Sequence, residues 1–443
     1  MTPSPPPAAP VPTTGRGPHR SGLPVPRRVL VVVATFLLSF LLYVDRVCIS
    51  TAKAPIVADL GLTDAQFGWV LSAFAFGYAL LQTPSGALAD RYGARRVLAA
   101  VVTFWSIFTG LTAAAWNFTS MLVVRFLFGA GEAGAFPGMA RAVYSWIPVS
   151  ERGLVKGINF SASRLGAAVT MPLLPWMIAA LGWKQAFMLL MVVGFGWALA
   201  WWLWFRDEPA EHRGISRDEL AQILAQRQDA NVSVSDHVPP LSTGTMLRSA
   251  NLWLMMGQYF AGNFTFFFCL TWLFPYVQKT YHLSYTQAGF YAMIPLLCGA
   301  AGNIFSGWMV DALFRSGHAA FSRRLPAMLG LGLAAAGLVS SVGQASIGGA
   351  VFWLSIAIFG ADMTLSPSWS FCIDIGGRHA GKVSGTMNMA GNLGSALVAI
   401  AFPYLLAWTG GPAAFFYIGA TLNVAGIILW AFTRADRKVG STP

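Results

Sequence analysis

Ionisable side chains interrupt apolar segments of this chain at two places, where a charge is costly. Asp45 and Arg46 interrupt the apolar run FLLSFLLYVDRVCIS (36–50), and Arg125 and Glu132 lie in a later apolar segment. Charged groups in hydrocarbon cost at least a few kcal/mol by insertion scales and usually mark a substrate path or a proton relay. An arginine fork suits a carboxylate, and a carboxyl group can take up and release a proton.

The spacing of these residues allows two interpretations. Arg125 and Glu132 are seven residues apart, which places them on one face of a helix, whereas the adjacent Asp45 and Arg46 diverge by about 100°. Either the acids and arginines neutralise one another and hold two helices together, or they face a cavity in which a cation binds an anionic solute. Because replacing an ion pair with apolar residues is often neutral or stabilising, the second interpretation is favoured.

The composition identifies the class of protein. Of the 443 residues, 56% are hydrophobic and 10% are charged, whereas soluble domains carry roughly 25% charged residues. We therefore expect an all-α membrane protein. Apolar segments close to the length of about 20 residues that crosses a bilayer lie near 29–49, 65–87, 97–115, 119–144, 154–179, 185–205, 251–277, 286–310, 325–343, 349–373, 383–408 and 412–433.

The distribution of Lys and Arg predicts the topology. Alternate loops and the two tails carry 22 of the 29 basic residues on one side and 3 on the other, while Arg46, Arg125, Arg141 and Arg164 lie within segments. By the positive-inside rule both termini are cytoplasmic. The net charge of +12 is thus an orientation signal, and nucleic acid is not expected as a partner.

One long polar stretch divides the segments into two halves of six. The expected organisation is a disordered cytoplasmic tail (1–26), an N-terminal six-helix bundle (27–206), a cytoplasmic linker (207–249), a C-terminal six-helix bundle (250–433) and a cytoplasmic tail (434–443).

The two halves repeat each other. GLVKGINFSASRLGAA from Gly153 aligns with GKVSGTMNMAGNLGSA from Gly381, and SGALADRYGARR from Ser85 aligns with SGWMVDALFRSG from Ser306, with one Asp in register. Parallel repeats of this kind are typical of transporters whose two halves rock about a site between them. Small residues at four-residue spacing also allow tight helix packing, which explains the glycines but not the shared register.

GALADRYGARR (86–96) resembles the signature between the second and third helices of the major facilitator superfamily. YVDRVCIS, RFLFGAGEAGAFPG, ERGLVKG and FFFCLTWLFPYV are similar to stretches of its anion:cation symporter family, carriers of hexuronates, aldonates and aromatic acids. The resemblance implies twelve helices in two pseudo-symmetric bundles. The conformational-gating residues that it implies, with the repeat partner Asp311, are Gly86, Asp90, Arg91, Gly93, Arg95, Arg96 and Asp311.

The resemblance also implies roles within the membrane. Arg46 is expected to hold the substrate carboxylate, and Asp45 and Glu132, with Arg125, to couple protons to transport. Polar and aromatic residues expected to line the cavity, although each is also typical of helix packing, are Tyr43, Tyr78, Trp272, Ser366, Trp369, Asn388 and Asn392.

Arg164 and Asp362 depart from the family pattern. Arg164 shares a face with small residues, and its repeat partner is Asn392. As a second cavity cation, Arg164 would favour a substrate with two anionic groups. Equally, it could pair with Asp362, and the sequence leaves both alternatives open.

We therefore expect a multi-pass carrier of the cell inner membrane that imports an organic anion, a sugar acid or another carboxylate, by proton symport. Its partners are the anion, protons and the bilayer, and it acts as a monomer. An anion exchanger or efflux carrier is the alternative, and a transport-dead anion sensor is a third. No catalytic constellation, metal site or cofactor motif is visible, so an enzyme is not expected.

Overall fold

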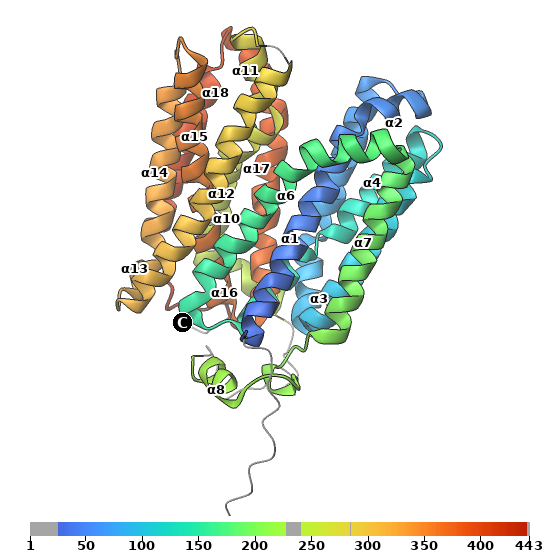
Figure 1. Cartoon of the computed structure of the whole chain (residues 1–443). Coiled ribbons are helices and arrows are strands. Elements are labelled where there is room, and N and C mark those ends of the chain that lie inside the picture. Colours follow the sequence, from blue (N-terminus) through green and yellow to red (C-terminus); the bar gives the residue numbers. More distant parts are fainter. Residues whose placement is uncertain (1–24, 227–240, 284, 441–443) are drawn as a thin grey trace, which may run out of the picture.

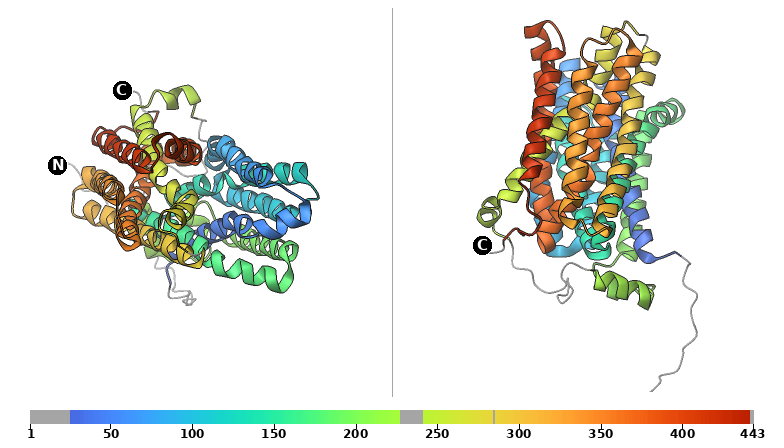
Figure 2. Two further views of the ribbon diagram at one scale, coloured as in Figure 1. Left: turned by 90° about the horizontal axis from the view of Figure 1, so that it is seen from above. Right: turned by 90° about the vertical axis from the view of Figure 1, so that its left-hand side faces the viewer.

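The computed structural model describes residues 25–226, 241–283 and 285–440. Most of the expected tail 1–26 and part of the expected linker, 227–240, lie outside these residues. The described residues form helices, which group into two bundles side by side (Figures 1 and 2). The first bundle contains α1 (Arg27–Thr51), α2 (Lys53–Leu60), α3 (Asp64–Ala113), α4 (Phe118–Glu132), α5 (Ala135–Trp146), α6 (Arg152–Leu181) and α7 (Trp183–Trp204).

The short helices α8 (Arg217–Ala225) and α9 (Thr243–Leu247) lie between the bundles in sequence. α8 lies at one end of the molecule, beside the start of α1 (Figure 1), where Glu219 accepts a hydrogen bond from the backbone N–H of Arg28. The second bundle contains α10 (Ala250–Thr271), α11 (Leu273–Thr280), α12 (Tyr285–Arg315), α13 (Ala319–Ser322), α14 (Arg324–Ser341), α15 (Ile347–Met363), α16 (Leu365–Gly376), α17 (Ala380–Thr409) and α18 (Ala413–Ala431).

The helices provide twelve membrane crossings. Among the described residues, seven stretches are long and apolar enough to cross a membrane, and two of them, 66–113 and 347–398, have 48 and 52 residues, enough for two crossings each. The other three crossings, 118–146, 152–181 and 250–280, are interrupted or contain charged side chains. The expected all-α fold of two six-helix bundles is therefore confirmed.

Prolines break two crossings at equivalent places. Pro137 and Pro367 are each the third residue of a short helix, α5 and α16. A proline has no N–H to donate to the carbonyl four residues earlier, so the hydrogen-bond ladder is interrupted directly after Glu132 in one crossing and after Asp362 in the other. Both acids therefore lie at helix breaks in the middle of the bundles.

Two carboxylates join the bundles at the end where α8 lies, which we call the closed end. Asp90, on α3, accepts hydrogen bonds from the backbone N–H groups of residues 381–382 at the start of α17, at 2.8 and 2.7 Å. Asp311, on α12, accepts from residues 153–154 at the start of α6, at 2.9 and 2.7 Å. Each carboxylate thus caps the positive end of a helix in the opposite bundle.

Glycines allow this close approach. A Cβ atom on Gly86 would overlap the carbonyl oxygen of Gly381, and a Cβ atom on Gly307 would overlap that of Gly153. These two pairs are repeat partners, so the same contact is made twice. A third carboxylate, Asp374, accepts from Arg152 at 2.8 Å and from Arg323 at 3.1 Å.

The other residues of the gating motif hold the turn between two crossings. Gly93 has a φ of +83°, a left-handed conformation that favours glycine, and it breaks α3. Asp207 accepts from the backbone N–H of Arg95 at 3.0 Å, and the Arg95 guanidinium donates to the Trp202 carbonyl at 2.9 Å. Arg91 and Arg96 are exposed.

We predict that Asp90→Asn and Asp311→Asn each favour separation of the bundles at the closed end. Hydrogen bonds to a charged group contribute about 1.5–3 kcal/mol, so each variant should raise the separated population several-fold or more. Spin labels on the exposed residues Tyr92 and His318 would report this by pulsed electron resonance. An unchanged distance distribution in both variants would show that these caps do not hold the end closed.

Candidate functional site

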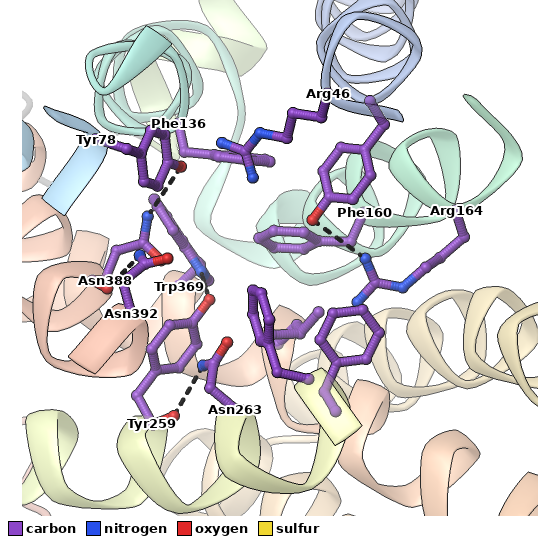
Figure 3. A pocket seen from close by; sticks show the side chains of 14 residues that line it. Arg46, Tyr78, Phe136, Phe160, Arg164, Tyr259, Asn263, Trp369, Asn388 and Asn392 are labelled. Carbon is purple, nitrogen blue, oxygen red and sulfur yellow. Dashed lines mark hydrogen bonds between the residues drawn. The ribbon is translucent and has the colours of Figure 1, made fainter. Parts of the chain in front are cut away.

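A cavity lies between the two bundles and is lined by both (Figure 3). The free volume of this cavity is about 30 Å³, which leaves room for about two waters. A larger solute can therefore bind only if the cavity walls move. The first bundle provides Tyr43, Arg46, Tyr78, Phe136, Phe160 and Arg164, and the second provides Tyr259, Asn263, Phe266, Phe267, Leu365, Trp369, Asn388 and Asn392.

Three aromatic rings from both bundles pack together in the cavity wall. The ring centroids of Phe136 and Phe160 are 5.4 Å apart. The ring centroid of Trp369 lies 5.6 Å from that of Phe136 and 5.7 Å from that of Phe160. Such pairs contribute about 0.5–1.5 kcal/mol each beyond burial of their area. The indole N–H of Trp369 donates to the Tyr259 hydroxyl at 2.8 Å. The cluster therefore adds an apolar contact between the bundles.

Arg46 and Glu132 form an ion pair in this cavity wall. The Arg46 Nε donates to both carboxylate oxygens of Glu132, at 2.9 and 3.0 Å, and Glu132 is completely buried. The Arg46 Nη2 is buried without a hydrogen-bond partner. The guanidinium lies 4.3 Å from the Tyr78 ring centroid and extends into the cavity (Figure 3). One side of Arg46 is therefore occupied by Glu132, while Nη2 remains a donor without an acceptor.

Asp45 is buried next to Arg46 in the chain but is not among the residues that line the cavity. Its Oδ2 accepts from the indole N–H of Trp105 at 3.0 Å, and its Oδ1 is buried without a partner. Arg125 is buried, 4.3 Å from the Phe128 ring centroid, and interacts electrostatically with Asp45 and Glu132. Asp45, Arg46, Arg125 and Glu132 therefore form a group of four buried charges that sum to zero when all are ionised.

Arg164 and Asp362 form a second ion pair, and this one joins the bundles. The Arg164 Nε and Nη2 donate to the two carboxylate oxygens of Asp362 at 2.9 and 2.7 Å. Nη1 donates to the Tyr43 hydroxyl at 3.4 Å, and the guanidinium lies 3.7 Å from the Phe266 ring centroid. Of the two alternatives for Arg164, the structure shows the pair with Asp362, and Arg164 still lines the cavity.

Amides and hydroxyls form the remaining polar wall. Asn388 Nδ2 donates to the Tyr78 hydroxyl at 3.5 Å, and Asn392 Nδ2 donates to the Asn388 carbonyl at 2.8 Å. Asn263 Nδ2 donates to the Tyr259 carbonyl at 2.8 Å. Amide oxygens accept hydrogen bonds and amide nitrogens donate them, so this wall can bind hydroxyl groups of a solute.

The structure separates two of the expected lining residues from the others. Tyr43, Tyr78, Trp369, Asn388 and Asn392 line the cavity with Arg46 and Arg164. Trp272 instead packs on Phe402, with ring centroids 5.4 Å apart. Ser366 lies at the contact between bundles, where its hydroxyl donates to the Gly153 carbonyl. Neither is among the residues that line this cavity.

Several lining residues were not expected from the sequence. Tyr259 and Asn263 are one helical turn apart, as are Asn388 and Asn392, and this spacing of polar side chains on one helix face could have found them. The aromatic and aliphatic residues had no such signal because phenylalanine is abundant, with 32 in the chain. They are Phe136, Phe160, Phe266, Phe267 and Leu365.

Comparisons with known proteins agree on one family. The family model described as Major Facilitator Superfamily matches residues 35–399. The chain is 32% identical to a probable sulfoacetate transporter, SauU, of Cupriavidus necator, covering 90% of this chain and 92% of the relative. It is 30% identical to a probable galactarate/D-glucarate transporter, GarP, of Escherichia coli K12, covering 93% and 95%.

A solved structure has the same fold. The proton:xylose symporter XylE, bound to 6-bromo-6-deoxy-D-glucose, superposes with a TM-score of 0.73 at 16% identity, covering 92% of this chain and 96% of XylE.

We predict that Asp45 and Arg125 are energetically coupled. Arg125→Gln should lower the free energy of unfolding by about 3–5 kcal/mol because it leaves an uncompensated buried charge. Adding Asp45→Asn should cost less than the two single substitutions together, with a coupling of roughly 0.5–3 kcal/mol. Unfolding of the purified protein in detergent measures this cycle, and strictly additive effects would contradict it.

Proposed function

This chain belongs to the major facilitator superfamily, and we propose that it imports a small organic anion together with protons. The anion that the cavity favours is a sugar acid or another small carboxylate. The single observation that carries the proposal is Arg46: a guanidinium in a cavity between two bundles, with Glu132 on Nε and a buried Nη2 that lacks an acceptor.

Competition for Arg46 provides the coupling. A substrate carboxylate that accepts from the free edge of Arg46 places a second negative charge beside Glu132. Protonation of Glu132 removes this repulsion and releases Arg46 to the substrate, so the proton and the anion bind together. Asp45 lies within electrostatic reach of Glu132 and offers a second buried carboxyl group on the proton's path.

The distribution of charge supports an orientation. We assign the closed end to the cytoplasm of a cell inner membrane, since the basic loops lie on that side by the positive-inside rule. In this assignment both termini are cytoplasmic and the structure is closed to the cytoplasm through Asp90 and Asp311. Separation of the bundles at the closed end then exposes the cavity to the cytoplasm. Because one chain provides the whole cavity lining, a monomer suffices for transport.

The substrate class rests on the cavity wall and on the relatives. Carboxylates suit Arg46, while the amides of Asn263, Asn388 and Asn392 suit the hydroxyls of a sugar acid. The relatives are named for sulfoacetate and for galactarate and D-glucarate. Uptake into proteoliposomes with an imposed pH gradient, across a panel of uronates, aldonates, hexarates, sulfoacetate, tartrate and phthalate, tests the proposal. If the pH gradient drives accumulation of none of these acids, the proposal is contradicted.

We predict that Glu132→Gln abolishes accumulation of a monocarboxylate driven by a pH gradient but retains exchange of labelled for unlabelled substrate. Glutamine keeps the shape of the side chain but cannot carry a proton. Counterflow and gradient-driven uptake in the same proteoliposomes separate the two activities. If the variant still accumulates substrate, protons are carried elsewhere, and if exchange is lost as well, Glu132 is needed for binding rather than for coupling.

We predict that Arg46→Lys weakens substrate binding about tenfold or more. Lysine keeps the charge but lacks the planar fork that binds a carboxylate through two parallel hydrogen bonds, and a hydrogen bond between charged groups contributes about 1.5–3 kcal/mol. The apparent KM of uptake measures the change. Wild-type affinity in Arg46→Lys would show that the fork does not hold the substrate.

A further inference from the structure

Glu132 and Asp362 occupy equivalent places in the two bundles. Each lies at the end of the first part of a broken crossing, in α4 and α15, and each precedes by five residues the proline that interrupts the helix. Each is buried and accepts hydrogen bonds from an arginine that lines the same cavity. The structure therefore repeats the arrangement of a carboxylate paired with a cavity arginine.

The two arginines differ in how much of the guanidinium is in use. Arg46 donates to its acid through Nε alone and has a buried Nη2 without a partner. Arg164 uses Nε and Nη2 for Asp362, and its Nη1 lies 3.4 Å from the Tyr43 hydroxyl. Arg46 can therefore bind an anion first. Arg164 becomes available for an anion only when its ion pair with Asp362 breaks.

The two arginines are close enough for one solute. Their guanidinium carbons lie 5.2 and 5.7 Å from the centroid of the Tyr43 ring, so they are at most 10.9 Å apart, the sum of these distances. A small diacid can bridge such a separation when each anionic group accepts at about 2.7–2.9 Å from one guanidinium. Figure 3 shows both side chains extending toward the same space.

We infer that Arg164 and Asp362 form a second half-site, and that the substrate is a small dianion carried with two protons. This inference rests on the proposed function, and it adds the number of anionic groups and of protons. One anionic group binds Arg46 while Glu132 takes a proton, and the other binds Arg164 while Asp362 takes a proton. Both protons come from the outer solution and leave with the substrate on the inner side.

The charges of the cavity require this balance. With Arg46, Glu132, Arg164 and Asp362 all ionised, the two pairs sum to zero. A dianion would leave two uncompensated negative charges in a poorly solvated cavity, which is costly. Two protons restore neutrality, so the loaded carrier is as neutral as the empty one. A monoanion would occupy only the Arg46 half-site and would need one proton.

The surroundings of Asp362 suit a carboxylate that changes partner. The ionisable groups that face it are Arg164 from α6 and, at longer range, Cys269 from α10. Tyr43 from α1 lies on the other edge of Arg164, and Gly299 on α12 leaves room for the carboxylate because a Cβ atom there would overlap Oδ2. Within the described residues, Arg164 is thus the cation that Asp362 contacts directly.

The test compares two acids that differ in one anionic group. Galactarate carries two carboxylates and galactonate carries one, with a hydroxymethyl group in place of the second, and sulfoacetate provides a dianion of another kind. Proteoliposomes with a gradient of one pH unit and no membrane voltage give the accumulation ratio. For a dianion this limit is about 100-fold with two protons and about 10-fold with one, since each proton contributes a factor of ten.

The wild type should concentrate at least one dianion toward the 100-fold limit, and an imposed membrane voltage should not change that uptake. It should favour galactarate over galactonate by at least tenfold in kcat/KM. In Asp362→Asn, dianion accumulation should fall toward the 10-fold limit and become sensitive to voltage. The double variant Arg164→Gln/Asp362→Asn leaves no unpaired charge, and in it the preference for galactarate over galactonate should disappear.

Asp374→Asn is the matched control, because Asp374 also joins the bundles, through its ion pair with Arg152, but lies at the closed end. It can change the transport rate but should keep two protons per dianion. One proton per dianion in the wild type, or a preference for galactonate, overturns the second half-site while proton symport stands. Absence of gradient-driven uptake of every acid in the panel instead contradicts the proposed function itself.

Discussion

An arginine buried between membrane helices needs a negative partner, and this constraint organises the centre of the molecule. Isolated charges are too costly in a low-dielectric interior. Arg46 meets the constraint with Glu132, and Arg164 meets it with Asp362. An ion pair can exchange one carboxylate for another at small net cost if the released acid is neutralised, and an anion arriving with a proton satisfies that condition. Exchange of partners at a fixed cation thus links the stability of the empty carrier to the proposed transport.

Charged groups are also compensated by partners at the closed end, but the partners there are different. Asp90 and Asp311 cap helix starts of the opposite bundle, where backbone N–H groups replace the guanidinium. Each contact joins one carboxylate to backbone N–H groups. Glycines where the helices cross allow the helices to approach closely. A few strong, local hydrogen bonds can stabilise the conformation with a closed end and can still break when the bundles rock. In the proposed transport cycle, the cavity pairs and the closed-end caps therefore act on the same conformational equilibrium.

Much of this arrangement could be predicted from the sequence, because repeats and charges are rare signals in an apolar chain. The register of Asp90 with Asp311 predicted that the two are equivalent gating residues, and the charges within apolar segments predicted a group around Arg46 and Glu132. Contacts that depend on helix breaks could not be predicted in the same way. Trp272 and Ser366 both lie at such breaks, where the chain turns away from ideal helical periodicity, and their side chains face other helices. The pair of Arg164 with Asp362 depends on how the two bundles approach, which no local pattern encodes.

The central claim is that anion binding and proton uptake are one event at the cavity arginines. Calorimetric titration of the purified wild-type protein with galactarate or sulfoacetate, in two buffers of different ionisation enthalpy at one pH, counts the protons exchanged on binding. The account predicts net proton uptake that grows as the pH is raised, because more of the carboxylates then start ionised. Binding with the same enthalpy in both buffers at every pH would mean that no proton is taken up, and it would contradict the account.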